Sequence, residues 1–166
     1  QGYSSAASDV YKRQDEYSVL MMDSFEVKLK NKFLPFLYPN QYVEFTSKTK
    51  AVKEAKKLAK DSKDDLAIVK AVYNYVVKNV KYDDEKAQNV QSGYLPSVDE
   101  TLKTKKGICF DYAALMTAML RSQGIPTKLE IGYSGDIYHA WISTWLNEKG
   151  WVDTVSYTHL RAHETS

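Results

Sequence analysis

The sequence has little of several features that would by themselves assign a function. It contains one cysteine, Cys109, which excludes an internal disulfide and a structural zinc site built from cysteines. The formal net charge is only +2, so no charge excess points to nucleic acid or to a membrane surface. No apolar run approaches the roughly 18 residues that span a bilayer. Hydrophobic residues still make up 43% of the 166 residues, which is enough for one domain with one core.

The two ends of the chain fit no periodic element. Residues 1–14 are polar, and residues 156–166 abruptly end a strand pattern. Both stretches resemble translated sequencing-adapter DNA, so we expect non-native or disordered tails, with natural polar tails as the alternative. On this interpretation His159 and His163 drop out as ligand candidates. The natural segment is then about residues 15–155, cut short at its C-terminal side.

Between these ends the sequence divides into an N-terminal arm, residues 15–46, and a core domain, residues 47–155. In the arm, residues 25–29 and 42–45 alternate between apolar and polar side chains. This alternation predicts one or two short strands, which prolines interrupt.

The first half of the core domain is predicted to be mainly helical. Residues 47–62 carry apolar side chains at helical spacing, and Asp64 or Asp65 can cap a second helix that ends near Tyr82. Residues 86–96 are polar and loop-like. Ser97 then has the spacing of a capping box and opens a short helical turn.

The second half of the core domain changes from a helical to a strand pattern. Gly107 precedes a long apolar-periodic helix that ends at Gly124, with Pro126 beyond. Three strand-like runs follow, over residues 127–133, 138–146 and 151–155, and short turns separate them. Helices followed by an antiparallel meander predict an α+β fold in which the N-terminal helices pack on an antiparallel sheet.

Cys109 falls on the first turn of the predicted long helix. Backbone N–H groups and the positive end of the helix dipole favour a thiolate at that position, and a thiolate is a nucleophile. The backbone N–H of Cys109 is also a natural donor to an oxyanion, with Tyr94 or Gln91 as guesses for a second donor. The alternative is that a lone cysteine is a small buried hydrophobic residue.

His139 lies thirty residues after Cys109, on the second predicted strand. On that strand His139, Trp141, Ser143 and Trp145 share one face. An imidazole near the helix start could take the thiol proton and return it to a leaving amine. The alternatives are a strand histidine with a satisfied hydrogen bond and, for Trp141, a core tryptophan rather than a wall against water.

Asp153 comes fourteen residues after His139, across one tight hairpin. A carboxylate there could hold the imidazole N–H and select its tautomer, and an ordinary surface aspartate is the alternative. Asp136 lies in a predicted turn and is worse placed. Asp111 lies on the first turn of the helix, where its negative charge interacts favourably with the helix dipole. The same charge disfavours a thiolate at Cys109.

Together these residues resemble the core of the transglutaminase-like superfamily of papain-like thiol enzymes, especially its bacterial members. The matching features are Gly107-Ile108-Cys109 opening a helix, Arg121-Ser122-Gln123-Gly124-Ile125-Pro126 ending it, Gly132-Tyr133, and Tyr138-His139-Ala140-Trp141. The resemblance covers residues 66–155 and leaves residues 15–45 unexplained.

The resemblance implies a Cys-His-Asp triad that acts on an amide or acyl group without a metal or organic cofactor. Cys109 would be the nucleophile and His139 the base. The family's acid often follows a tryptophan in a Trp-x-x-x-Asp-Pro setting, whereas Trp151-Val152-Asp153 is shorter and no proline follows. Either Asp153 takes this role, or we expect the fragment to have lost its acid, and with it closing strands, past Val155.

The expected function is therefore cysteine-dependent acyl transfer or hydrolysis on a protein, peptide or cell-wall-type amide substrate. A catalytically inert protein-binding module is the alternative, and a redox-sensing thiol is less favoured because the chain has no resolving cysteine. The resemblance makes an extracytoplasmic or cell-surface location plausible. No feature suggests a nucleic-acid partner or an oligomeric state.

Overall fold

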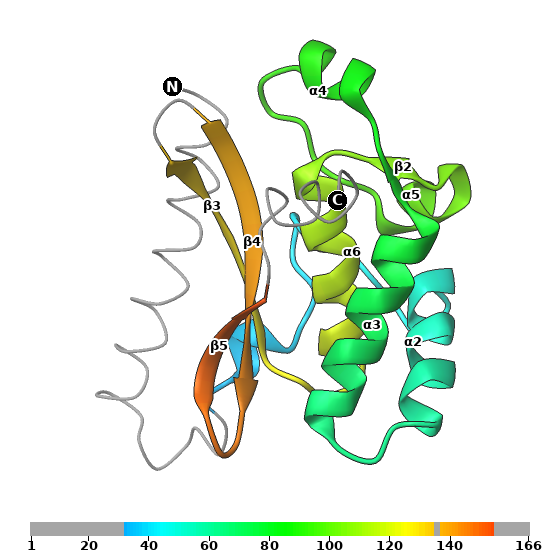
Figure 1. Ribbon diagram of the computed structural model, residues 1–166, viewed down its shortest axis with the longest axis vertical. Coiled ribbons are helices and arrows are strands. Elements are labelled where there is room, and N and C mark those ends of the chain that lie inside the picture. The colour runs from blue at the N-terminus through cyan, green and yellow to red at the C-terminus, as the bar shows by residue number, and fades with distance from the viewer. Residues whose placement is uncertain (1–31, 135–136, 155–166) are drawn as a thin grey trace.

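The computed structural model describes residues 32–134 and 137–154 (Figure 1). The side chains of residues 133–139 also lie outside the described part. The strand expected at residues 25–29 and both terminal tails fall outside the described residues.

Helices and strands alternate along the first part of the described chain and give way to strands alone near its end. The helical elements are η1 Leu34–Phe36, α2 Lys50–Lys60, α3 Asp65–Asn79, α4 Asp84–Asn89, α5 Val98–Thr104 and α6 Cys109–Ser122. The strands are β1 Lys81–Tyr82, β2 Lys106–Gly107, β3 Thr127–Ser134, β4 Ile137–Leu146 and β5 Gly150–Thr154.

Strands β3, β4 and β5 form an antiparallel sheet in that order. The pairing of β3 with β4 runs from Thr127 opposite Thr144 to Ser134 opposite Ile137. Helices α2, α3 and α6 lie beside this sheet, with α6 between the sheet and the other two helices (Figure 1). The predicted α+β fold, with helices before an antiparallel meander, is confirmed.

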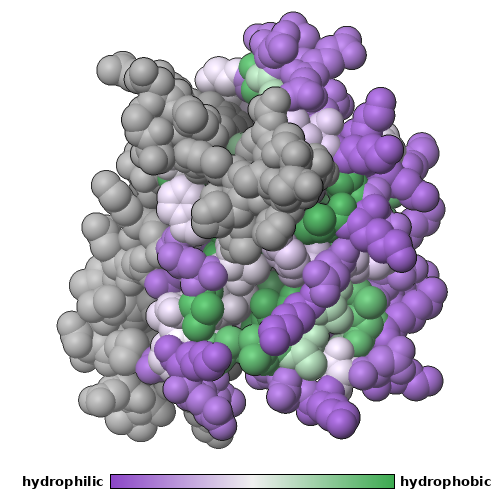
Figure 2. All heavy atoms as spheres, viewed as in Figure 1, coloured by the Kyte–Doolittle hydropathy of each residue, from purple (hydrophilic) through white to green (hydrophobic). Residues whose placement is uncertain are grey.

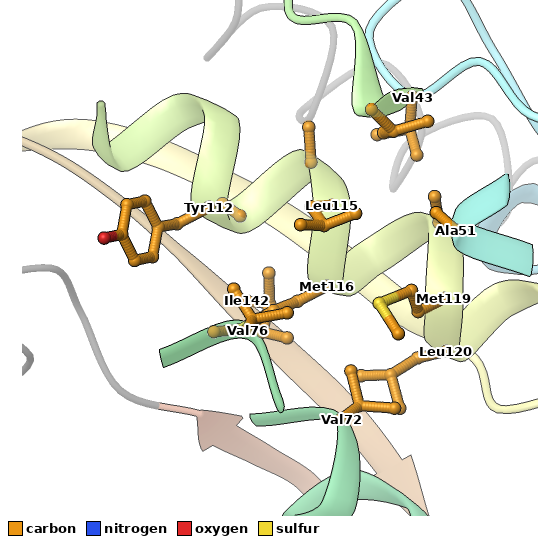
Figure 3. Close-up of a cluster of buried hydrophobic side chains, with 14 of the residues drawn as sticks. Val43, Ala51, Val72, Val76, Tyr112, Leu115, Met116, Met119, Leu120 and Ile142 are labelled. Carbon is orange, nitrogen blue, oxygen red and sulfur yellow. The ribbon is translucent and has the colours of Figure 1, made fainter. Parts of the chain in front are cut away.

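Helix α6 forms the centre of the core. Thirteen of its 14 residues are buried, because α2, α3, α5 and the sheet all pack against it. Side chains from several elements converge on Leu115, Met116, Met119 and Leu120 of this helix (Figure 3). The sequence predicted a single apolar face for this helix, but Ala113, Ala114 and Ala118 are buried as well, and such small side chains leave room for neighbouring elements to pack closely.

The starts of the preceding helices follow the predicted signals. The Asp64 side chain accepts a hydrogen bond from the Ala67 N–H at 2.8 Å and caps α3. The Ser97 hydroxyl accepts from the Glu100 N–H at the start of α5. Helix α3 ends at Asn79, earlier than predicted, because the chain continues into β1 beside β2.

Two predictions of local structure were wrong. The expected strand at residues 42–45 is irregular, because the Asn40 side chain accepts the N–H groups of Tyr42 and Val43 in a turn. The expected loop at residues 86–96 begins inside α4. There the Asp83 side chain accepts the Lys86 N–H and caps a short helix.

The surface over the helices is mostly hydrophilic, with smaller hydrophobic patches (Figure 2). This agrees with the alternation of exposed lysines and buried alanines along α2. Among the described residues, no helix combines the length and apolar character that a bilayer crossing requires.

Arg121 ties the end of α6 to two other segments. Its side chain is 3% exposed. It donates from Nε and Nη2 to the Thr127 carbonyl, and from Nη1 to the Tyr38 carbonyl at 2.9 Å. Burial lowers the pKa of Arg121 to about 10. The cation therefore depends on these carbonyls for its solvation.

We expect Arg121→Met to lower the free energy of unfolding by about 3 kcal/mol, because the buried Thr127 carbonyl and the part-buried Tyr38 carbonyl lose charged donors. Urea unfolding followed by tryptophan fluorescence measures this loss. Arg121→Lys should recover less than half of it, since an ammonium cannot reproduce the planar fork. Lys53→Met on the exposed side of α2 is the control and should stay within about 0.5 kcal/mol of the wild type. An equally small change in Arg121→Met would contradict this account.

Candidate active site

The segment that leads into α6 is held by backbone pairing. Strand β1 pairs in parallel with β2, so that Tyr82 lies opposite Gly107. The Asp83 N–H donates to the Gly107 carbonyl at 2.9 Å. A Cβ on Gly107 would lie 2.7 Å from the Cβ of Asp111, which explains why this position carries a glycine. The end of α3 thereby positions the residue two places before Cys109.

Cys109 is the first residue of α6 and is 4% exposed. Burial raises the pKa of its thiol to about 11, although the backbone N–H groups of Ala140, Phe110 and Cys109 itself act in the opposite direction. The charge of Asp111 raises this pKa further. The predicted donors at the helix start are therefore in place.

The backbone N–H groups act on the Cys109 thiol in the direction expected for a helix start, towards the thiolate. Desolvation of the buried sulfur nevertheless outweighs these hydrogen bonds, and the pKa of the thiol is raised. Deprotonation near neutral pH then requires a base or a further cation close to Cys109.

His139 lies in β4, where its backbone is opposite Gly132 of β3. Its side chain lies outside the described residues. The adjacent residue, Ala140, is 3% exposed, and its backbone N–H is the donor that acts on the Cys109 sulfur. The backbone of β4 therefore reaches the sulfur one residue away from His139. The roles of Cys109 and His139 stay predictions.

Asp153 lies in β5, opposite Ser143 of β4. The Ser143 hydroxyl donates to Asp153 Oδ1 at 2.5 Å and is 3.3 Å from Glu130 Oε2. Ser143 is four residues along β4 from His139, a spacing of roughly 13 Å in an extended strand. Asp153 thus has a partner of its own, and its role toward His139 stays a prediction.

Asp111 is the buried acid closest in sequence to Cys109. It has no exposed surface and accepts three hydrogen bonds. The donors are the Ile108 N–H at 2.9 Å, the Tyr94 hydroxyl at 2.5 Å and the Lys86 ammonium at 2.9 Å. Lys86 Nζ also lies 4.5 Å from the centre of the Tyr94 ring. The sequence indicated that Asp111 interacts favourably with the helix dipole. It gave no sign that Lys86, twenty-five residues earlier, forms an ion pair with Asp111.

Other residues singled out in the sequence have different surroundings from those expected. The Tyr94 hydroxyl donates to Asp111, and burial followed by this hydrogen bond raises the pKa of Tyr94 to about 12. Gln91 is exposed and its amide donates to the Asn89 carbonyl. Trp141 is half-buried, with its ring over Gly132, so it is not a fully buried core residue.

Comparison with known proteins supports the family suggested by these motifs. The sequence profile described as the transglutaminase-like superfamily matches residues 53–154. A stretch of 75 residues is 37% identical to UPF0252 protein MJ1282 of Methanocaldococcus jannaschii and covers 42% of this chain and 21% of that protein. Another of 70 residues is 34% identical to the protein-glutamine gamma-glutamyltransferase of Pseudomonas aeruginosa, covering 33% and 10%.

The fold is similar to a solved structure as well. The periplasmic domain of TgpA from Pseudomonas aeruginosa superposes with a TM-score of 0.59 and 25% identity, over 74% of this chain and 47% of that one. The chain spans less than half the length of each of these three proteins. Since the family profile matches well over half of the sequence, from α2 to β5, the chain belongs to the transglutaminase-like superfamily.

Proposed function

We propose that this protein carries out cysteine-dependent acyl transfer or hydrolysis on an amide or peptide substrate, with Cys109 as nucleophile and His139 as base. The observation that carries this proposal is the position of the Cys109 sulfur. It lies at the start of a buried helix, within reach of the backbone N–H of Ala140, the residue next to His139. Membership of the transglutaminase-like superfamily supports the same chemistry.

The reaction would proceed through a thioester. Cys109 Sγ attacks the carboxamide carbon while the His139 imidazole takes the thiol proton, and the backbone N–H of Cys109 is the proposed oxyanion donor. The C–N bond then breaks, and the imidazolium gives its proton to the departing amine or ammonia. An amine or water next attacks the thioester and loses a proton to the imidazole. That proton returns to the sulfur as the acyl group leaves.

The group that orients His139 is proposed to be either Asp153 or an acid past Val155. The pairing of Asp153 with Ser143, four residues along β4 from His139, favours the second choice. A carboxylate that fixes an imidazole tautomer must touch the ring, and Asp153 Oδ1 is already the acceptor for the Ser143 hydroxyl.

Similar proteins, rather than the geometry of the site, guide the choice between an amine and water as the acceptor of the acyl group. The related Pseudomonas protein is named a protein-glutamine gamma-glutamyltransferase, so a glutamine carboxamide is the first substrate to test. The similar solved domain is periplasmic, which supports the proposal of an extracytoplasmic location here. Ammonia is released from a glutamine peptide in both reactions, so the peptide product distinguishes them: a primary amine joined to the peptide marks transfer, and a glutamate in place of the glutamine marks hydrolysis.

A catalytically inert binding module is the second candidate, because Cys109 is buried and the pKa of its thiol is about 11. Such a module would release no ammonia and would bind peptide equally well after Cys109→Ala. An enzyme would lose all turnover in the same variant.

The proposed base can be tested without knowing the substrate. We expect iodoacetamide to alkylate Cys109 near pH 7 at least about tenfold faster in the wild type than in His139→Ala, because the imidazole lowers the cost of ionising a thiol whose pKa is otherwise about 11. As Cys109 is the only cysteine, the mass of the intact protein reports this one site.

His163→Ala is the matched control, since it removes a histidine from the C-terminal tail. It should leave the alkylation rate unchanged. Identical pH profiles for the wild type and His139→Ala, both rising up to strongly alkaline pH, would remove His139 from the proposed mechanism.

Asp153→Asn tests the third member of the triad. We expect the rate of alkylation and any turnover to change by less than about threefold, because Asp153 pairs with Ser143. By contrast, loss of the orienting acid of a catalytic triad lowers turnover on the order of ten-thousandfold. Rates are compared at matched fractions of folded protein, measured by urea unfolding. A loss of a hundredfold or more in a stably folded variant would instead assign the triad acid to Asp153.

A further inference from the structure

We propose that Lys86 is a positioning residue for the nucleophile and that it acts through Asp111. Its ammonium holds the buried carboxylate against the start of α6 and offsets the negative charge beside Cys109. This proposal rests on the proposed nucleophilic role of Cys109, but it concerns Lys86 and Asp111, which the proposed mechanism does not use.

The geometry links Lys86 to Cys109 in two steps. Lys86 Nζ lies 2.9 Å from Asp111 Oδ2, and the same oxygen accepts the Ile108 N–H at 2.9 Å. Ile108 is the residue immediately before Cys109. Gly107 leaves just enough room for the Asp111 side chain to fold back on this turn. Asp111 therefore fixes the backbone that places the sulfur.

The charge of Asp111 makes its neutralisation important. The carboxylate has no exposed surface and raises the pKa of the Cys109 thiol. A buried carboxylate without a cation would raise it more, because fields are weakly screened in the interior. Lys86 is the cation within ion-pair distance of Asp111 among the described residues, and Tyr94 adds a neutral donor.

Lys86 is suited to remain charged in this position. Burial lowers its pKa, but its contacts with Tyr94 and Asp111 outweigh this effect and raise the pKa overall. The Lys86 side chain is 31% exposed, whereas Asp111 is enclosed. Lys86 and Tyr94 also line two cavities of about 570 and 440 Å³, so the ammonium keeps some contact with solvent.

Other titratable groups near this end of α6 are less well placed to act on Asp111. Lys81, Lys106 and Glu100, on β1, β2 and α5, are exposed. The Tyr112 hydroxyl donates to the Val80 carbonyl at 2.6 Å. His139 on β4 belongs to the proposed mechanism, and its variant therefore enters the test.

The experiment is alkylation of Cys109 by iodoacetamide from pH 6 to pH 10 in the full chain, read by intact mass. We expect Lys86→Met to slow alkylation about tenfold at a given pH, which corresponds to a rise of one unit in the thiol pKa. Lys86→Arg should stay within about threefold of the wild type. Lys70→Met, which removes an exposed lysine of α3, is the matched control and should change nothing.

The pathway through Asp111 is tested by a double-mutant cycle. In an Asp111→Asn background, Lys86→Met should have no further effect on alkylation. An equal effect in both backgrounds would mean that Lys86 acts on the sulfur directly, and would overturn the proposal. Should Asp111→Asn not fold, the comparison of Lys86→Met with Lys86→Arg still decides whether a cation at this position matters.

Two other results would also overturn the proposal. One is an unchanged rate in folded Lys86→Met. The other is a faster rate, which a loosened helix start would give by exposing the sulfur. Repeating Lys86→Met in the His139→Ala background separates the two proposals: the Lys86 effect should persist there, whereas failure of the proposed base would appear only as the absence of a His139 effect.

Discussion

The buried carboxylate of Asp111 is the interaction on which the functional end of this fold depends. An ionised group with no exposed surface must be surrounded by donors, because its desolvation otherwise costs several kcal/mol. Asp111 recruits one donor from the turn before α6, one from α4 and one from the segment that follows α4. The stretch from Lys86 to Tyr94 is thereby held against the turn that precedes Cys109.

A second buried charge performs a similar task at the opposite end of the same helix. Arg121 draws the Thr127 and Tyr38 carbonyls together and so orients the start of β3 and the segment at Tyr38. Between the two charges, α6 packs on every side through aliphatic and small side chains. Apolar packing stabilises α6, while Asp111 and Arg121 at its two ends determine which polar segments pack against it. This division is typical of buried polar groups that select one arrangement among several apolar ones.

Local signals were sufficient to predict most of the helices and strands. The caps at Asp64 and Ser97, the glycine before Cys109 and the alternation of β4 act over a few residues, so a single sequence contains them. The parallel pairing of β1 with β2 joins residues twenty-five apart over only two positions, and no periodicity can emerge from so short a strand. The strand expected at residues 42–45 does not form, because capture of two backbone donors by the Asn40 side chain competes with strand pairing.

The candidate site was predictable in its residue types and less so in its electrostatics. The sequence pattern indicated that Cys109 begins a helix, and the resemblance to the superfamily implied that the strand of His139 lies near it. The contact of Ala140 with the sulfur agrees with both expectations. The sequence could not reveal the depth of burial, which depends on how closely α3, α5 and β4 surround α6. Nor could it reveal the ion pair of Lys86 with Asp111, which joins segments twenty-five residues apart.

Burial of Cys109 is compatible with its proposed role as nucleophile if its ionisation is coupled to the proposed base rather than to solvent. A sulfur with a pKa of about 11 is almost entirely protonated near neutral pH, and a thiol in that state resists oxidation and unspecific alkylation. A base that accepts the proton only as the sulfur attacks avoids the full cost of a desolvated thiolate, because the charge passes to the oxyanion as it forms. The donors at the start of α6 then stabilise the developing oxyanion. In such a site the donors at the helix start serve mainly the transition state, because burial outweighs their effect on the resting pKa of the thiol.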